Sequence, residues 1–299
     1  MRKNYVPYRR LVIYHNKFNL VSLKDLDNLE NNLLFSIFNQ MKYDDSEFFF
    51  RLDELKGMIG GNKNLTNIEV INKLESLKSK FFGLYFDIIL PRRDITTNLF
   101  SQMIIEYTID NKIFKGLTIK LNVDAIDIFQ KLKKEFTSFD LQIFKKLKSK
   151  YSKSLFRLLS QYSSLGKYQC NYQWLREYLG VPTNYDYKTF NFQILTPSVK
   201  ELSNQFKKLN VEVTRYRENN KVIHKDIIFS FIPFQNSSSE KIEILSKDKN
   251  KKALFALRVA SNELNKIANS KALANKDYSK EQEAVKMIDT IRYTKAQYN

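Results

Sequence analysis

The chain has 299 residues, more than one ordinary hydrophobic core needs, and this length indicates two domains. Hydrophobic residues make up 43% of it, and the seven glycines and five prolines are too few for a low-complexity chain, so wholesale disorder is excluded. Fifty Lys and Arg against 32 Asp and Glu give a net charge of +18, which favours a polyanionic partner such as nucleic acid.

The first part of the chain predicts three helices, strands and a hairpin. Apolar residues spaced three and four apart over Leu26–Met41 predict a helix, and Glu47–Arg51 is short and aromatic like a strand. A brief helix from Asp53 to Gly60 and a longer one over Val70–Phe81 follow. The remaining predicted strands are 86–90, which Pro91 closes, and the arms of a hairpin, 104–109 and 115–123.

Residues 126–150 are predicted to form a basic connecting helix. An apolar stripe runs from Leu141 to Tyr162 at helical spacing, and most lysines between 145 and 153 lie off it. Residues 131–188 hold 12 basic and 4 acidic side chains, so positive charge is concentrated in this region. The free side of the helix is interpreted either as a phosphate-binding face or as an ordinary solvated lysine face.

The second part of the chain predicts the same elements again. The predicted elements are helices over 151–162, 173–179 and 189–206, a strand near 168–171, and a hairpin of 211–216 and 222–232. Pro197 lies inside the third of these helices, where its missing N–H favours a bend or a later helix start. A serine-rich linker at 235–239 then precedes a polar helical tail.

Three blocks of the first part match the second part in the same order and at a nearly constant offset of 120 to 125 positions. The matched blocks are 34–41 with 155–162, 55–60 with 175–180, and 70–88 with 195–213. This internal repeat indicates two copies of one supersecondary unit.

The order helix, strand, helix, helix, hairpin is that of a winged helix, in which the third helix enters the DNA major groove and the hairpin, or wing, touches the flanking backbone. We therefore expect an α+β protein with two tandem winged-helix domains and a C-terminal helical tail. The expected boundaries are 20–125 for the first winged helix, 126–150 for the connecting helix, 151–234 for the second winged helix, which reads the DNA, and 235–299 for the linker and tail.

Several kinds of chemistry have no support in the sequence. His15 and His224 are the two histidines and Cys170 the single cysteine, so neither a zinc set nor the histidine pair of rolling-circle nucleases can form. The glycines near Lys63 lack the spacing of a phosphate loop. We expect no enzyme, catalytic residue, metal or cofactor. Without a disulfide pair or an apolar run of about 18 residues, a cytoplasmic protein with no membrane partner is expected.

Five segments of the second copy, taken together, resemble the initiator Rep protein family of iteron-carrying, theta-replicating plasmids. The segments are 149–159, 175–181, 190–195, 199–202 and 227–231, and the resemblance extends over roughly 20–234. It implies a replication initiator that binds double-stranded DNA at repeated origin sites (iterons), helps to open the origin, and recruits a host initiator and the replicative helicase. It also implies a monomer–dimer equilibrium, in which the first winged helix makes the dimer contact. The dimers are expected to repress the chain's own gene.

The chain departs from the family at Asn191, Phe192 and Gln193, where some relatives carry consecutive arginines after the residue equivalent to Phe190. Asn and Gln suit adenine rather than guanine, so Asn191 and Gln193 are candidates for adenine contacts. Helix capping is the alternative role for both. The full set of candidate DNA-binding residues is Lys63, Asn64, Thr66, Asn67, Lys73, Arg92, Arg93, Lys148, Lys150, Lys153, Arg157, Lys188, Thr189, Asn191, Gln193, Lys200, Arg215, Arg217, Lys221 and Lys225.

Two other functions are compatible with the same sequence. A transcriptional regulator with tandem winged helices reads DNA in the same way, and a structural adaptor could use the basic face to bind proteins. Direct repeats in the DNA bound beside the gene would favour the initiator over the regulator.

Overall fold

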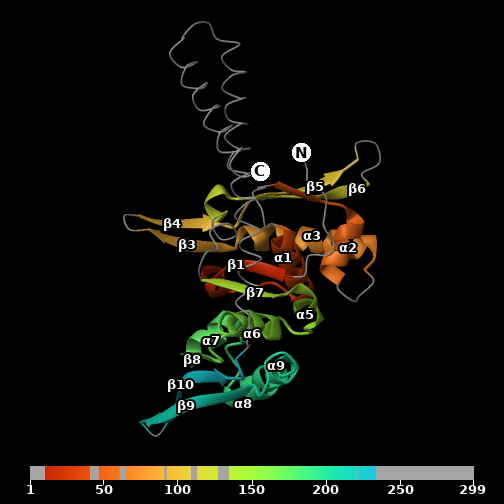
Figure 1. Cartoon of the computed structure of the whole chain (residues 1–299). Helices are drawn as coiled ribbons and strands as arrows, with labels where there is room; N and C mark the ends of the chain where they lie inside the picture. Colours follow the sequence, from red (N-terminus) through yellow and green to blue (C-terminus); the bar gives the residue numbers. More distant parts are fainter. Residues whose placement is uncertain are drawn as a thin grey trace, which may run out of the picture. The chain divides into compact units, whose positions relative to one another are not determined.

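The computed structural model describes residues 11–40, 47–60, 65–90, 93–108, 113–126, 135–219 and 221–233, which belong to one compact unit, Met1–Gln235. Within them the chain forms two winged helices, as the element order predicts (Figure 1). The predicted linker and tail, 235–299, lie outside the described residues.

The first winged helix has its strands in the order β2-β6-β5, all antiparallel, with Phe48 opposite Ile119. Its elements are α1 (Asn28–Gln40), β2 (Glu47–Phe50), α2 (Leu52–Gly60), α3 (Asn67–Phe82), β5 (Phe100–Tyr107), β6 (Phe114–Leu121) and the short η2 (Val123–Ala125). A second hairpin, β3 (Tyr85–Leu90) and β4 (Arg93–Asn98), follows α3. The strand β4 was not predicted, because its mostly polar sequence shows no apolar alternation.

The second winged helix repeats this topology, with strand order β8-β10-β9 and Tyr168 opposite Phe229. Its elements are α6 (Lys150–Gln161), β8 (Lys167–Asn171), α7 (Tyr172–Leu179), α8 (Tyr187–Phe190), η3 (Asn191–Leu195), α9 (Thr196–Leu202), β9 (Asn210–Glu218) and β10 (Lys221–Ser230). In each copy the strand after the first helix pairs with the second strand of the wing, which supports the repeat found in the sequence.

Local capping explains where the helices begin. The Asp27 carboxylate accepts hydrogen bonds from the backbone N–H groups of Leu29 and Glu30, both at 2.9 Å, and Glu30 accepts one from the Asp27 N–H at 2.8 Å. This capping box starts α1, and Thr66 with Glu69 forms another at α3. Each box satisfies backbone donors that the first turn of a helix leaves without an intrahelical partner.

The expected basic helix over 126–150 is not present in the described part of that region. Residues Phe136–Asp140 form a strand, β7, which pairs with β1 (Leu11–His15), and the two lie side by side in Figure 1. The helix α5 (Leu141–Lys146) follows, capped by Asp140, and the backbone is extended at Leu147 before α6 begins. The apolar stripe therefore crosses two helices, each with its own cap.

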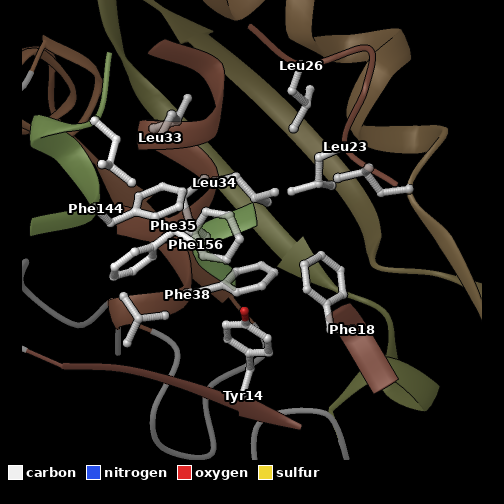
Figure 2. Close-up of a cluster of buried hydrophobic side chains, with 14 of the residues drawn as sticks. Tyr14, Phe18, Leu23, Leu26, Leu33, Leu34, Phe35, Phe38, Phe144 and Phe156 are labelled. Carbon is white, nitrogen blue, oxygen red and sulfur yellow. The ribbon is translucent and has the colours of Figure 1, made fainter. Parts of the chain in front are cut away.

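One hydrophobic core extends through both winged helices. Figure 2 shows its aromatic centre, where Tyr14 and Phe18 meet Phe35 and Phe38 of α1. The Phe35 ring lies 4.6 Å from that of Phe144 on α5. Phe156 of α6 reaches the same cluster and also contacts Phe206, which lies after α9. The helix α6 thus belongs to the cores of both copies, since aromatic side chains contribute large buried apolar areas.

Candidate nucleic-acid interface

The third helix of the second winged helix is continuous from Tyr187 to Leu202 and consists of α8, η3 and α9. Asp186 caps it, because its carboxylate accepts a hydrogen bond of 2.8 Å from the Thr189 N–H. The side-chain hydrogen bond with Thr189 and then this backbone bond lower the pKa of Asp186, and the charges of Lys188 and Arg176 act in the same direction. Asn191 and Gln193 lie inside the helix, so the alternative that they cap it is wrong.

The segment η3 is a turn of π-helix, in which the Thr196 N–H bonds the carbonyl of Asn191, five residues earlier. It ends two residues before Pro197, which has no N–H and whose ring would clash with a carbonyl in a regular α-helix. The wider π turn lets the helix continue past the proline. The predicted disturbance at Pro197 therefore takes the form of a π turn instead of a later helix start.

The third helix has one buried side and one open side. Phe190, Ile194 and Leu195 are buried, and the Phe190 ring lies 5.8 Å from that of Tyr172 on α7. The exposed residues of this helix are Lys188, Phe192, Gln193, Thr196, Pro197 and Lys200, and Thr189 and Asn191 are partly exposed. Lys188 and Lys200 form no ion pair with a carboxylate of the described residues. The open side thus presents amides and free cations.

Arg176 of α7 holds the loop that leads into this helix. Its guanidinium donates to the Tyr185 carbonyl at 2.5 Å and lies 5.5 Å from the centre of the Phe190 ring. A hydrogen bond and a cation–π contact from one side chain fix the start of the helix against α7. Arg176 is not among the predicted site residues, although it lies in the repeated block Leu175–Gly180.

The wing contacts the start of the same helix through His224. The imidazole of His224, on β10, stacks on the Tyr187 ring with centroids 4.2 Å apart. Its pKa is lowered by burial and then by the positive charges of Arg215 and Arg176. Arg215 is directly opposite His224 in the β9–β10 pair, so an exposed arginine of the wing lies close to the helix start.

The other wing candidates have different placements. Arg217 is exposed and opposite Val222, near the turn. Lys225 is exposed within a β-bulge of β10, where Thr214 accepts a 3.0 Å hydrogen bond from the Asp226 N–H. Lys221 begins β10, but its side chain lies outside the described part. Arginines and a lysine on a wing are well placed for the DNA backbone.

The candidates of the first winged helix are not gathered in this way. Thr66 caps α3, and Asn67 is exposed at its first turn. Lys73 pairs with Asp27, and the other two lysines of α3, Lys78 and Lys80, also pair with carboxylates of the chain. Lys63, Asn64 and Arg92 lie outside the described residues, as does the side chain of Arg93 on β4. The lysines of α3 are therefore already neutralised.

Two candidates of α6 are buried, and we withdraw them as phosphate contacts. The Lys153 ammonium donates to Asn32 Oδ1 at 2.5 Å and to the Phe144 carbonyl at 2.7 Å. Arg157 donates to the Phe18 carbonyl at 2.7 Å, and both side chains are 0% exposed. The helices α1 and α5 and the segment with Phe18 cover the face of α6 that carries them, so neither can reach DNA in this conformation.

Two neighbouring lysines remain at the surface. Lys148 is exposed, and its backbone N–H donates to Glu201 at 2.6 Å. The Lys150 ammonium is partly exposed and donates to the Lys24 carbonyl at 2.8 Å. Lys148 therefore remains the freer candidate for a phosphate contact.

Metal-ion clusters and membrane-spanning helices are both absent from the described residues. No cluster of His, Cys, Asp and Glu there has the arrangement to hold a metal ion. None of the helices in this part of the chain is both long and apolar enough to cross a membrane.

Comparison with known proteins identifies the family. The model of the initiator replication protein family for its first winged helix matches residues 11–160, and the model for its second winged helix matches residues 171–231. The chain belongs to the initiator replication protein family. The first match begins at β1 and ends within α6, and the second begins at the last residue of β8.

The similarity extends to a curated relative and to a solved structure. A probable replication protein of Bifidobacterium longum (strain NCC 2705) is 27% identical over 194 residues, and the match covers 64% of each chain. The crystal structure of the Pi initiator protein in complex with iteron DNA matches with a TM-score of 0.53 and 16% identity, over 77% of this chain and all of that one. At that identity the second match shows the shared fold.

Proposed function

We propose that this chain is a plasmid replication initiator that binds repeated double-stranded DNA sites at an origin. The open side of the helix from Tyr187 to Leu202 enters the major groove, and the β9–β10 wing lies on the flanking backbone. The observation that carries the proposal is the location of Arg215 on the wing, beside the start of a helix whose open side carries unpaired cations and amides.

Other observations support the same proposal. The chain is strongly basic, with a net charge of +18, which attracts DNA at long range. The family consists of replication initiators, and the Pi initiator of the same fold was crystallised with iteron DNA. In the second copy Lys188 and Lys200 form no ion pair with a described carboxylate, whereas the lysines of α3 do. The second winged helix therefore supplies most of the DNA contacts in this proposal.

The remaining parts of the proposal concern assembly. The chain acts without catalysis or cofactor, in the cytoplasm, by helping to open the origin and by recruiting a host initiator and the replicative helicase. Its first winged helix mediates a monomer–dimer equilibrium, and the dimer represses the chain's own gene. Light scattering of the full chain over a concentration series tests the equilibrium.

Footprinting of the full chain on the DNA that flanks its gene tests the proposed function. Protection of several direct repeats supports an origin-binding initiator. Protection of a single inverted site would instead indicate a transcriptional regulator. No protection at any protein concentration would reject the proposal and would favour a protein partner for the basic face.

Replacing Asn191 or Gln193 with Ala is expected to weaken binding to the footprinted site by about 1–3 kcal/mol, with little effect on random DNA. Both amides lie inside the third helix and are at least partly exposed, so their loss removes base contacts without removing a cap. Titration of labelled duplexes measures both affinities, and thermal melting checks the fold. Gln142→Ala removes an exposed helical amide outside this helix and should change neither affinity.

Arg217→Ala is expected to weaken binding to the specific site and to random DNA alike, and to reduce the slope of log K against log salt by about one. Arg217 is exposed near the turn of the wing, where a phosphate contact carries no sequence information. Binding measured between low and high salt gives the slope. The control is Lys167, an exposed cation outside the wing turn, which lies opposite Ser230 at the end of β8. Lys167→Ala should leave the salt slope unchanged.

A further inference from the structure

Phe192 is an exposed aromatic residue at the centre of the proposed DNA-reading side. Its side chain is 73% exposed, the highest value for any aromatic residue among the described residues. A large apolar side chain left in water gains nothing for folding, because its burial is what would stabilise the protein. The ring is therefore available to a partner outside the chain.

The core does not need this ring. Phe190, two residues earlier, is fully buried and contacts Tyr172 and Arg176, and Ile194 and Leu195 fill the following core positions. Among the described aromatic residues Phe192 forms no ring contact. Its exposure follows from the helical period, which turns residue 192 away from the face that carries 190 and 194.

The neighbours of Phe192 indicate the chemistry of the partner. Asn191 and Gln193 adjoin it in the chain, and Lys188 lies one turn before it on the same exposed side. A hydrophobic protein partner would meet cations and amides here, whereas the floor of the major groove offers base edges and one apolar group, the C5-methyl of thymine. Phenylalanine is among the side chains that suit this methyl group.

We propose that Phe192 reads thymine, by packing its ring against the C5-methyl group of a thymine in the bound DNA. This inference rests on the proposed function, because it requires the third helix to enter the major groove. It assigns a specificity role to the position between the two amides. Adenine recognition by Asn191 or Gln193 and thymine recognition by Phe192 together would favour A·T pairs in the recognised site.

The test removes the methyl group from the DNA and the ring from the protein. The full chain first selects duplexes from a random-sequence pool. Each thymine of the selected duplex is then replaced singly by deoxyuridine, which lacks the methyl group but keeps the same hydrogen-bonding edge. Affinities are measured for the wild type, for Phe192→Ala and Phe192→Leu, and for Leu165→Ala as a control at a residue 69% exposed in the turn between α6 and β8.

We expect the wild type to lose about fourfold in affinity at one or two thymines, the value for one buried methyl group. Phe192→Ala should bind thymine and deoxyuridine equally at those positions, Phe192→Leu should keep part of the difference, and Leu165→Ala should behave as the wild type. All variants should melt as the wild type does, since both side chains are exposed.

The outcomes separate this inference from the proposed function. A pool that yields no preferred sequence would reject both. A preferred sequence together with a Phe192→Ala variant that still discriminates at every thymine would reject the role of Phe192 alone. Equal losses by Phe192→Ala on selected and random duplexes, without any effect of the methyl group, would likewise overturn it.

Discussion

Arg157→Ala is expected to lower the free energy of unfolding by about 3–5 kcal/mol, as other large truncations and broken buried polar contacts do. The Arg157 side chain is fully buried, donates to the Phe18 carbonyl at 2.7 Å, and lies 5.2 and 5.3 Å from the rings of Phe18 and Phe35. Its removal leaves a cavity and a buried carbonyl without its donor. Urea unfolding followed by circular dichroism measures the loss.

Two further variants separate the causes. Arg157→Met keeps most of the volume but removes the donor, and it should cost about 1–3 kcal/mol, the range for one unsatisfied buried group. Arg217→Ala removes an exposed arginine of the wing, and it should leave the unfolding transition unchanged while it weakens DNA binding. If Arg157→Ala kept full stability and lost DNA affinity instead, Arg157 would be a DNA contact after all.

The stability of the chain is expected to rise between pH 7 and pH 9 through Lys153, by up to about 1.4 kcal/mol per pH unit. Burial lowers the pKa of Lys153 from 10.5 to about 7, with Lys145 acting in the same direction and Glu201 against it. In this window the unfolded chain holds a proton on Lys153 that the folded chain has released. The unfolded state thus binds more protons, so raising the pH favours the folded state. The contribution is complete above the unfolded pKa and is lost as the pH falls through 7.

Comparison with Lys153→Met isolates this effect. The difference in the free energy of unfolding between wild type and variant should change with pH over this window, because the variant has no proton to release. Burial also lowers the pKa of Lys145, to about 8, but Lys145 is present in both proteins. Lys148→Met, at an exposed lysine, should keep the wild-type slope. Parallel pH profiles for wild type and Lys153→Met would show that Lys153 stays charged when buried.

Much of the fold could be read from local patterns. The order of helices and strands in both copies follows from apolar spacing, since a helix or strand that buries one face repeats its apolar residues at 3.6 or 2 positions. Pro197 predicted an irregular third helix because its effect on the backbone is local, and η3 is that irregularity. The candidates Lys188, Gln193, Lys200, Arg215 and Arg217 are exposed, as a contact with DNA requires, because each lies off an apolar stripe or on a wing.

These local patterns did not predict the pairing of β1 with β7. The two strands join residues 11–15 to 136–140, across more than a hundred positions, and neither is long enough to be distinctive. Their partner is determined by contacts between distant segments, whereas periodicity reports the environment along one segment. The same limit explains the predicted helix over 126–150, where short segments of β7 and α5 share an apolar spacing that suits one longer helix.

The sequence by itself determined the repeated winged helices, the excess of positive charge, and the residues of the third helix and the wing that face outward. Only the tertiary structure decided that Lys153 and Arg157 are buried. Every residue of α6 from Ser152 to Ser160 is buried, although five of these nine side chains are polar or charged. A polar face is exposed only while nothing covers it. Here Asn32 of α1, the Phe18 carbonyl before α1 and the Phe144 carbonyl of α5 accept hydrogen bonds from the buried cations of that face. Burial depends on the packing of distant elements, which the period of one helix does not contain.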